Sequence, residues 1–421
     1  MCYSACARSG SMNVVVMGAQ WGDEGKGKIV DYLAEDADAV VRFAGGANAG
    51  HTIVANGKKF ALHQVPSGIL YNGKIVILGS GMVLDPEALF AELAMLSENG
   101  IEWKDRVFIS DRAHIVFPSY REKDKARDAK RVHPIGTTGR GIGTCYAEKA
   151  ERDGLRLADL EWNEKVESLC DEDKLMLAKF KDALLSMRVD IAKKMRELHA
   201  SGKNILFEGA QGAMLDLDSG TYPYVSSGAS CAAGASLGSG IGPRAIDKVC
   251  GVFKAYETRV GNGPMPSEFN SETESELCDY VRKTGNEFGV TTGRARRCGY
   301  LDLVALRYAC FVNSIDSLVL THLDIYDAMD EIEACVAYNI RGNEVNDFPA
   351  SIADLNDAKP VLKKFAGWKK DLHGAKTYDE LPSEAKAYIS FIENYTETKI
   401  DIISVGADRN ETFVRKSIWK K

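Results

Sequence analysis

The sequence predicts an α/β protein with a large, mainly parallel central sheet, flanking helices on both faces and antiparallel hairpin excursions. Three observations favour this fold class. Short β-branched runs alternate with helical segments along the chain, glycine-rich loops adjoin several of these runs, and two segments have hairpin patterns. Because ligands bind at the carboxyl ends of strands in such sheets, we expect the functional residues in those loops.

The first elements follow from short patterns near the N-terminus. Asn13–Gly18 (NVVVMG) predicts a buried parallel strand, and 28–37 has the apolar spacing of a helix. A second strand is expected within 38–46. Segment 52–63 predicts a hairpin, because Asn56-Gly57 suits a type I′ turn.

The next helix carries both start and stop signals. Within 84–100, Asp85 is placed to cap, Pro86 to occupy the first helical position and Asn99-Gly100 to end the helix. The remaining expected strands are 74–81, 106–110, 204–212, 249–260, 317–324 and 399–406. The other expected elements are a long polar helical region from about 160 to 201, helices 300–312 and 383–397, and a hairpin over 333–348.

Composition narrows the class of protein. Hydrophobic residues make up 45% and charged residues 27% of the 421 residues, which is typical of a globular protein. The net charge of −7 argues against a nucleic-acid binder. Scattered cysteines without CxxC pairs indicate a reduced, cytoplasmic protein, and no apolar run is long enough to span a membrane. We expect residues 1–12 to be an N-terminal extension and 13–421 to form one domain.

The stretch GAQWGDEGKGK (Gly18–Lys28) resembles a phosphate-binding loop with one departure. Gly22, Gly27 and Lys28 have Walker spacing, but Ile29 stands where a Ser or Thr would bind Mg²⁺. Asp23 within the loop could bind a metal or accept a proton, and the lysines could neutralise phosphate. The alternative is an ordinary glycine-rich turn with solvated charges.

Other loops carry polar residues suited to anions. His51 follows the loop GGANAGH and could donate a proton to a phosphoryl oxygen. TTGRGIG (137–143) and TTGRARR (291–297) combine hydroxyls with arginines, which match phosphate or carboxylate in two-point contacts. Asp324, in LTHLD, could accept hydrogen bonds from guanine. Each feature also has a plain structural explanation as a turn, a cap or an exposed loop.

Eight motifs together resemble the adenylosuccinate synthetase family. They are QWGDEGKGK, GGANAGHT, IGTTGRGIG, FEGAQGAMLD, GTYPYV, KAYETRVGNGP, GNEFGVTTGRARRCGYLD and DIISVGADR, in order from about residue 13 to 415. The resemblance implies a P-loop-like GTP-binding architecture. It also implies ligation of L-aspartate to IMP with GTP and Mg²⁺, through 6-phosphoryl-IMP, in a homodimer.

The family's catalytic and IMP-binding positions carry over onto matching residues. The resemblance implies that Asp23 is the base and metal ligand, that Lys26 and His51 assist phosphoryl transfer, and that Gly50 offers the metal a backbone oxygen. The implied IMP-binding set is Asp23, Lys26, Asn48, His51, Thr138, Arg152, Gln211, Ser226 and Arg294, and Gln211 is also implied in catalysis. Arg152 is expected to reach the active site of the neighbouring subunit.

The other two substrates have their own implied contacts. Aspartate is expected at Val290, Thr291, Thr292, Gly293, Arg294 and Arg296. GTP is expected at Gly22, Asp23, Glu24, Gly25, Lys26, Gly27, Lys28, Gly50, Thr52, Arg296, His322, Asp324, Ser404 and Gly406.

Three positions depart from the family pattern. Ser226 replaces a Thr but keeps the hydroxyl, His322 replaces the Lys of a TKLD motif, and Ala407 replaces a Pro. Because a histidine replaces the lysine, the stacking of the side chain at position 322 on guanine is in question. Two rival functions also stand against the resemblance. A P-loop kinase should have a hydroxyl after Lys28, and a non-catalytic GTP-binding module should need neither Asp23 nor His51.

Overall fold

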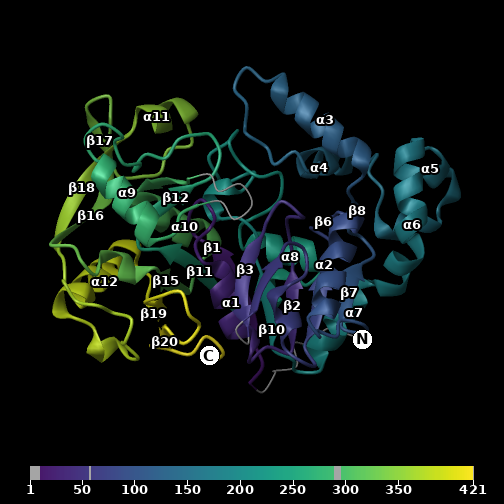
Figure 1. The fold of residues 1–421 in the computed structure, drawn as a ribbon, viewed down its shortest axis with the longest axis horizontal. Coiled ribbons are helices and arrows are strands. Elements are labelled where there is room, and N and C mark those ends of the chain that lie inside the picture. The colour runs from purple at the N-terminus through teal and green to yellow at the C-terminus, as the bar shows by residue number, and fades with distance from the viewer. Residues whose placement is uncertain (1–9, 56–57, 289–294, 421) are drawn as a thin grey trace.

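The computed structural model describes residues 10–55, 58–288 and 295–420, with the backbone alone at 51, 52, 54 and 55. Its centre is a ten-stranded sheet (Figure 1). Neighbouring strands pair in parallel, except for the outermost antiparallel pair, β19 and β20. The strands in spatial order are β20 (Thr412–Val414), β19 (Ile400–Ser404), β15 (Ser317–Thr321), β11 (Lys248–Lys254), β1 (Asn13–Gly18), β10 (Ile205–Glu208), β2 (Ala39–Arg42), β5 (Ile75–Leu78), β7 (Val107–Ser110) and β9 (Arg188–Val189). The predicted fold class is confirmed.

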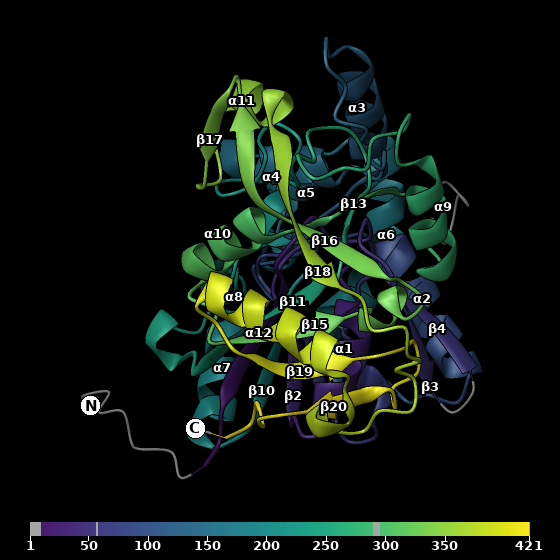
Figure 2. The ribbon, with the colours of Figure 1, turned by 90° about the vertical axis from the view of Figure 1, so that its left-hand side faces the viewer.

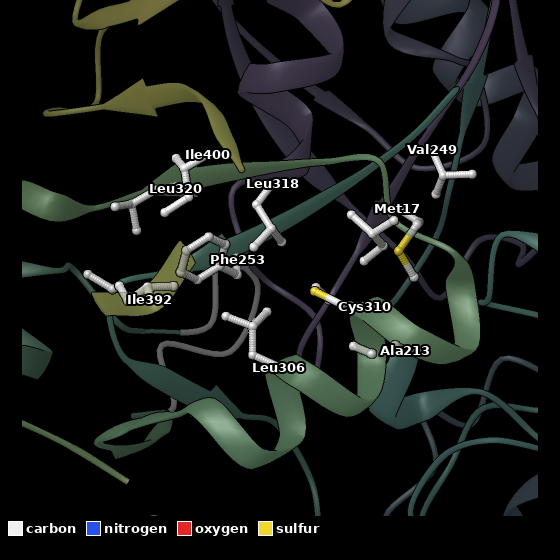
Figure 3. Packing of buried hydrophobic residues seen from close by; sticks show 14 of the residues in the cluster. Met17, Ala213, Val249, Phe253, Leu306, Cys310, Leu318, Leu320, Ile392 and Ile400 are labelled. Carbon is white, nitrogen blue, oxygen red and sulfur yellow. The ribbon is translucent and has the colours of Figure 1, made fainter. Parts of the chain in front are cut away.

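Helices cover both faces of the sheet, because alternate strand residues point to opposite faces. Val14 and Val16 of β1 pack in one core cluster, and Val15 and Met17 pack in another. Helices α1 (Lys26–Ala34), α2 (Pro86–Glu98) and α6 (Asp171–Met187) contribute to the first cluster. Helices α7 (Ile191–Ala200), α8 (Ala233–Ser239), α10 (Leu303–Asn313) and α12 (Ser383–Thr396) contribute to the second. Figure 3 shows Leu306 of α10 beneath the strands that carry Phe253 and Leu318.

Smaller elements surround the sheet. The predicted hairpins are confirmed as β3 (His51–Ala55) with β4 (Lys58–Leu62), and β16 (Glu331–Ile340) with β17 (Asn343–Val345). Strand β18 (Lys359–Ala366) also pairs with β16, and α11 (Ile352–Asp357) lies at the far end of this arm (Figure 2). The other elements are β6 (Val83–Leu84), β8 (His114–Ile115), α3 (Pro118–Ala129), α4 (Ile142–Glu151), α5 (Asn163–Glu167), β12 (Glu257–Arg259), α9 (Ser275–Thr284), β13 (Arg297–Gly299) and β14 (Leu301–Asp302).

Helix α2 confirms the capping prediction in detail. The Asp85 carboxylate accepts a hydrogen bond from the Ala88 backbone N–H at 3.1 Å, and Pro86 is the first helical residue. Helix α10 begins in the same way, since Asp302 accepts from the Ala305 N–H at 3.0 Å. It therefore begins at 303, not at 300 as the sequence predicted.

Two predicted elements were wrong in extent. The expected strand over 249–260 is divided, because the Gln20 side chain binds the backbone of Lys254 and Tyr256 and turns the chain out of the sheet. The expected helical region over 160–201 is interrupted by β9, which pairs with β7 at the edge of the sheet. Among the described residues, none of the helices has the length and apolar character that crossing a membrane requires.

Candidate active site

Loops at the carboxyl ends of neighbouring strands form the candidate site. Strands β19, β15, β11, β1, β10 and β2 lie side by side in parallel, so their carboxyl ends share one edge of the sheet. The loops that follow them contain Asp23, Asn48, Gln211, Asp324 and Gly406. Parallel pairing therefore gathers residues that lie hundreds of positions apart in the sequence.

The loop between β1 and α1 is organised by the carboxylate of Glu24. This side chain is fully buried and accepts backbone hydrogen bonds from Gln20 at 3.1 Å and Gly22 at 2.9 Å. Its other oxygen accepts from the Lys26 ammonium at 2.5 Å. The buried carboxylate of Glu24 thus fixes the backbone of the loop. Lys26 is the first residue of α1 and places a positive charge at the edge of the loop.

Asp23 lies at the exposed turn of this loop. Its backbone has φ 57°, a left-handed conformation that few residues other than glycine adopt. Its carboxylate lies 2.9 Å from Nε of Arg296, whose side chain is largely buried. Arg296 also reaches Glu287, which lies 2.7 Å from its Nη1 atom. Burial alone would lower the pKa of Arg296, but Asp23 and Glu287 raise it above the usual value.

The loop after β10 packs directly on the phosphate-type loop. A Cβ atom at Gly212 would lie 2.2 Å from the carbonyl oxygen of Gln20, so only glycine allows this approach. Gln211, next to it, also has a left-handed φ of 57°. The close packing fixes Gln211 beside Gly22.

The loop after β2 is held by a buried arginine. Arg42 donates to the carbonyl oxygens of Gly46, at 3.4 Å, and His63. Within the described part of the chain, the buried Oδ1 atom of Asn48 has no hydrogen-bond partner, which suits a residue that binds a ligand. His51 and Thr52 follow in β3, where only their backbone is described.

The end of β19 contacts the start of α1. Lys28 donates to the Ser404 hydroxyl at 2.8 Å and to the Gly406 carbonyl at 2.7 Å. Burial lowers the pKa of Lys28 to about 8, against the opposing effect of nearby carboxylates. Three residues of the predicted GTP set are therefore in direct contact.

Asp324 lines a pocket of about 510 Å³ that also includes Tyr280, Thr284 and Asp371. Its buried Oδ1 has no hydrogen-bond partner among the described residues, and burial raises the pKa of this carboxyl. His322 lies two residues earlier, edge-on to the Tyr256 ring at 5.8 Å between centroids. Burial and the charge of Lys254 lower the pKa of His322 to about 4, so its imidazole is neutral at pH 7.

Other predicted residues lie in different places. Thr138 is exposed in the connection between α3 and α4, and Arg152 is exposed at the end of α4 with a left-handed φ of 73°. Ser226 is partly buried, and its backbone N–H donates to the carbonyl oxygen of Leu215 at 2.8 Å. The predicted residues Val290, Thr291, Thr292, Gly293 and Arg294 lie outside the described residues.

Sequence reasoning missed a buried polar group behind the site. Lys254 lies 2.7 Å from Glu287, and the two side chains are 1% and 2% exposed. Gln20 binds the backbone of Lys254 through its Oε1 atom at 2.8 Å. The motif GNEFG contains Glu287, but only its burial beside Lys254 separates it from ordinary surface carboxylates.

These features define a class of protein: an α/β enzyme that uses a nucleotide. A glycine loop rimmed by lysines, an exposed carboxylate within it and a separate pocket of about 510 Å³ beside Asp324 lie at the carboxyl edge of one parallel sheet. A family model described as adenylosuccinate synthetase matches residues 15–413.

Comparison with individual proteins agrees with that match. Adenylosuccinate synthetase of Acetivibrio thermocellus is 46% identical over 423 residues, covering 95% of this chain and 99% of its own. That of Acaryochloris marina is 47% identical over 425 residues, covering 96% and 94%. The solved, fully ligated adenylosuccinate synthetase of Plasmodium falciparum superposes with a TM-score of 0.88 at 39% identity, covering 96% of this chain and 99% of that one.

The chain belongs to the adenylosuccinate synthetase family. It is a GTP-dependent ligase that joins L-aspartate to IMP to give adenylosuccinate, GDP and phosphate, which is the first committed step of AMP synthesis. The resemblance inferred from the motifs is confirmed, and both rival functions are set aside.

Proposed function

We propose that the reaction runs through 6-phosphoryl-IMP with Asp23 as the general base. Asp23 removes the N1 proton of IMP, O6 attacks the γ-phosphorus of GTP, and GDP leaves. The amine of aspartate then attacks C6, phosphate departs, and the amine loses a proton. The observation that carries this proposal is the position of Asp23: an exposed carboxylate inside the phosphate-type loop, faced by Arg296 at 2.9 Å.

Asp23 and Gly50 are the proposed ligands of Mg²⁺. One offers a carboxylate oxygen and the other a backbone carbonyl oxygen, and both residues are exposed. Mg²⁺ prefers such hard oxygen donors and usually keeps waters and phosphate oxygens as its other ligands. When bound, the ion supplies positive charge that stabilises the transferring phosphoryl group.

Three other residues assist the chemistry in this proposal. Lys26, now paired with Glu24, neutralises charge on the phosphates, and His51 donates a hydrogen bond to the transferring group. Gln211, held beside Gly22, positions IMP over the loop. The proposed IMP contacts further include Asn48, Thr138, Ser226 and Arg294.

The proposed GTP contacts span the loop and the pocket. The loop residues Gly22–Lys28 bind the phosphates of GTP, and Asp324 accepts hydrogen bonds from the edge of its guanine base. Ser404 and Gly406, fixed by Lys28, border the same region. The proposed set of GTP contacts is completed by Arg296, Gly50, Thr52 and His322.

We propose that segment 290–294 together with Arg296 binds aspartate. We also propose that residues 13–421 form one domain, which is built on one continuous sheet.

An omission assay tests the reaction. Purified protein with IMP, GTP, aspartate and Mg²⁺ should produce adenylosuccinate, followed by its ultraviolet absorbance. Leaving out any one of the four should abolish the signal. Product formed without GTP, or none with all four present, would remove the proposed mechanism.

We also propose a homodimer in which Arg152 reaches the neighbouring active site. Its exposed position at the end of α4 supports this role. Two inactive variants, Arg152→Ala and Asp23→Asn, should then restore each other when mixed and allowed to exchange subunits. A mixed dimer has one intact site, so random exchange restores about a quarter of wild-type activity. Activity that stays at background while exchange is demonstrated would place Arg152 outside the partner's site.

A further inference from the structure

A buried ion pair lies directly behind Arg296. Oε1 of Glu287 lies 2.7 Å from the Lys254 ammonium, and both side chains are almost wholly buried. The Tyr256 hydroxyl donates to the same oxygen at 2.5 Å. Two donors therefore fix one side of the Glu287 carboxylate against β11 and the turn that follows it.

The second oxygen of Glu287 faces the active site. Oε2 accepts from Nη1 of Arg296 at 2.7 Å, while Nε of the same guanidinium lies 2.9 Å from Asp23. The backbone N–H of Arg296 also donates to the carbonyl of Glu287 at 3.0 Å. Arg296 is thus held at one edge by a buried, immobilised carboxylate and at the other by an exposed carboxylate.

Glu287 is charged in this environment. Burial alone would raise the pKa of its carboxyl, but the Lys254 charge and the hydrogen bonds from Lys254 and Tyr256 lower the pKa to about 2. A buried, charged and doubly fixed carboxylate is a firm anchor for a guanidinium. Asp23, which is 38% exposed, is the weaker of the two attachments.

We propose that Glu287 is a positioning residue that acts through Arg296. It holds one edge of the guanidinium, so that the other edge can leave Asp23 and turn to an anionic group of the substrates. This inference rests on the roles proposed above for Asp23 and Arg296. Without the anchor, Asp23 is the remaining carboxylate partner of Arg296 within the described residues, and the guanidinium settles on the general base.

A double-mutant cycle tests the proposal. Glu287→Gln should lower kcat by at least about tenfold, the scale of a lost charged hydrogen bond, and leave KM for IMP within about twofold. In an Arg296→Leu background, the same change should lower kcat by less than about twofold, because there is no guanidinium left to position. An equal loss in both backgrounds would show that Glu287 does not act through Arg296.

Two further variants keep the result decisive. Glu393→Gln is the matched control: Glu393 is also a buried carboxylate, 2.6 Å from Arg415, but it lies away from the site, and kcat should be unchanged. If Glu287→Gln does not fold, Glu287→Asp replaces it in the cycle, since it keeps the charge but withdraws it from Arg296. Wild-type kinetics for Arg296→Leu alone would contradict the substrate contact proposed above for Arg296, whereas impaired kinetics of Arg296→Leu with additive losses would contradict only the positioning role of Glu287.

Discussion

Asp23→Asn should lower kcat by about 10³-fold or more, because the amide can neither accept the N1 proton nor serve as an anionic metal ligand. Asparagine is the suitable replacement, since after glycine it is among the residues that best tolerate the left-handed φ of 57° at this position. The loop should keep its shape, because Glu24 rather than Asp23 holds the backbone of Gln20 and Gly22.

The measurement is initial-rate adenylosuccinate formation, with thermal unfolding followed in parallel. Asp105→Asn is a matched control: Asp105 is also exposed, also has a left-handed φ, of 60°, and lies before β7. It should retain wild-type kcat. The unfolding temperature of Asp23→Asn should stay near wild type, because exposed ion pairs contribute little. A kcat within about tenfold of wild type would transfer the base role to another group.

The sequence predicted most of the sheet because its signals are local. Short β-branched runs and the Asp85-Pro86 helix start each depend on a few neighbouring residues, and so does the turn predicted at Asn56-Gly57, which lies outside the described residues. In a parallel sheet, the loops that follow the strands all lie at the same edge, so their residues come together whatever the sequence between them. This is why the loops containing Asp23, Gln211 and Asp324 could be placed at one edge of the sheet from the sequence alone.

The predictions failed where distant side chains decide the structure. The run 249–260 has strand residues throughout, but the Gln20 amide binds the backbone at Lys254 and Tyr256 and ends the strand there. No local pattern encodes a contact across more than 200 residues. The contact between Lys28 and Ser404 escaped the sequence for the same reason, although both residues were expected to bind GTP.

The anchor formed by Lys254 and Glu287 was hidden for a different reason. Charged residues are usually exposed, so a single sequence gives no reason to bury this Lys and Glu together. In the structure, Glu287 of this pair contacts Arg296, the one arginine of the TTGRARR cluster in contact with both Glu287 and Asp23 among the described residues. Arg297, next in the chain, turns away and pairs with Glu268.

Asp324→Asn should change which nucleotide the enzyme uses. Guanine presents two donors, N1–H and the N2 amino group, and a carboxylate can accept from both. An asparagine amide presents one acceptor and one donor, which instead matches xanthine, with N1–H and a carbonyl at C2. The Oδ1 atom of Asp324 is buried without a hydrogen-bond partner among the described residues, so it is available for this contact. We expect kcat/KM for GTP to fall by about 10²-fold, and xanthosine triphosphate to become the better substrate.

Asp327→Asn is the matched control, because it distinguishes a loss of guanine recognition from general damage to the pocket. Asp327 lines the same pocket, but its two oxygens already accept from the Trp368 indole at 3.0 Å and the Leu372 backbone at 2.9 Å. Its substitution should reduce stability while leaving the preference for GTP intact. Competition between the two triphosphates, with each product measured, gives the preference directly. If Asp324→Asn keeps the wild-type preference, the guanine edge is recognised elsewhere. A switch in Asp324→Asn but not in Asp327→Asn would locate that recognition at Asp324, whose buried Oδ1 has no hydrogen-bond partner among the described residues and whose neighbour His322 is neutral.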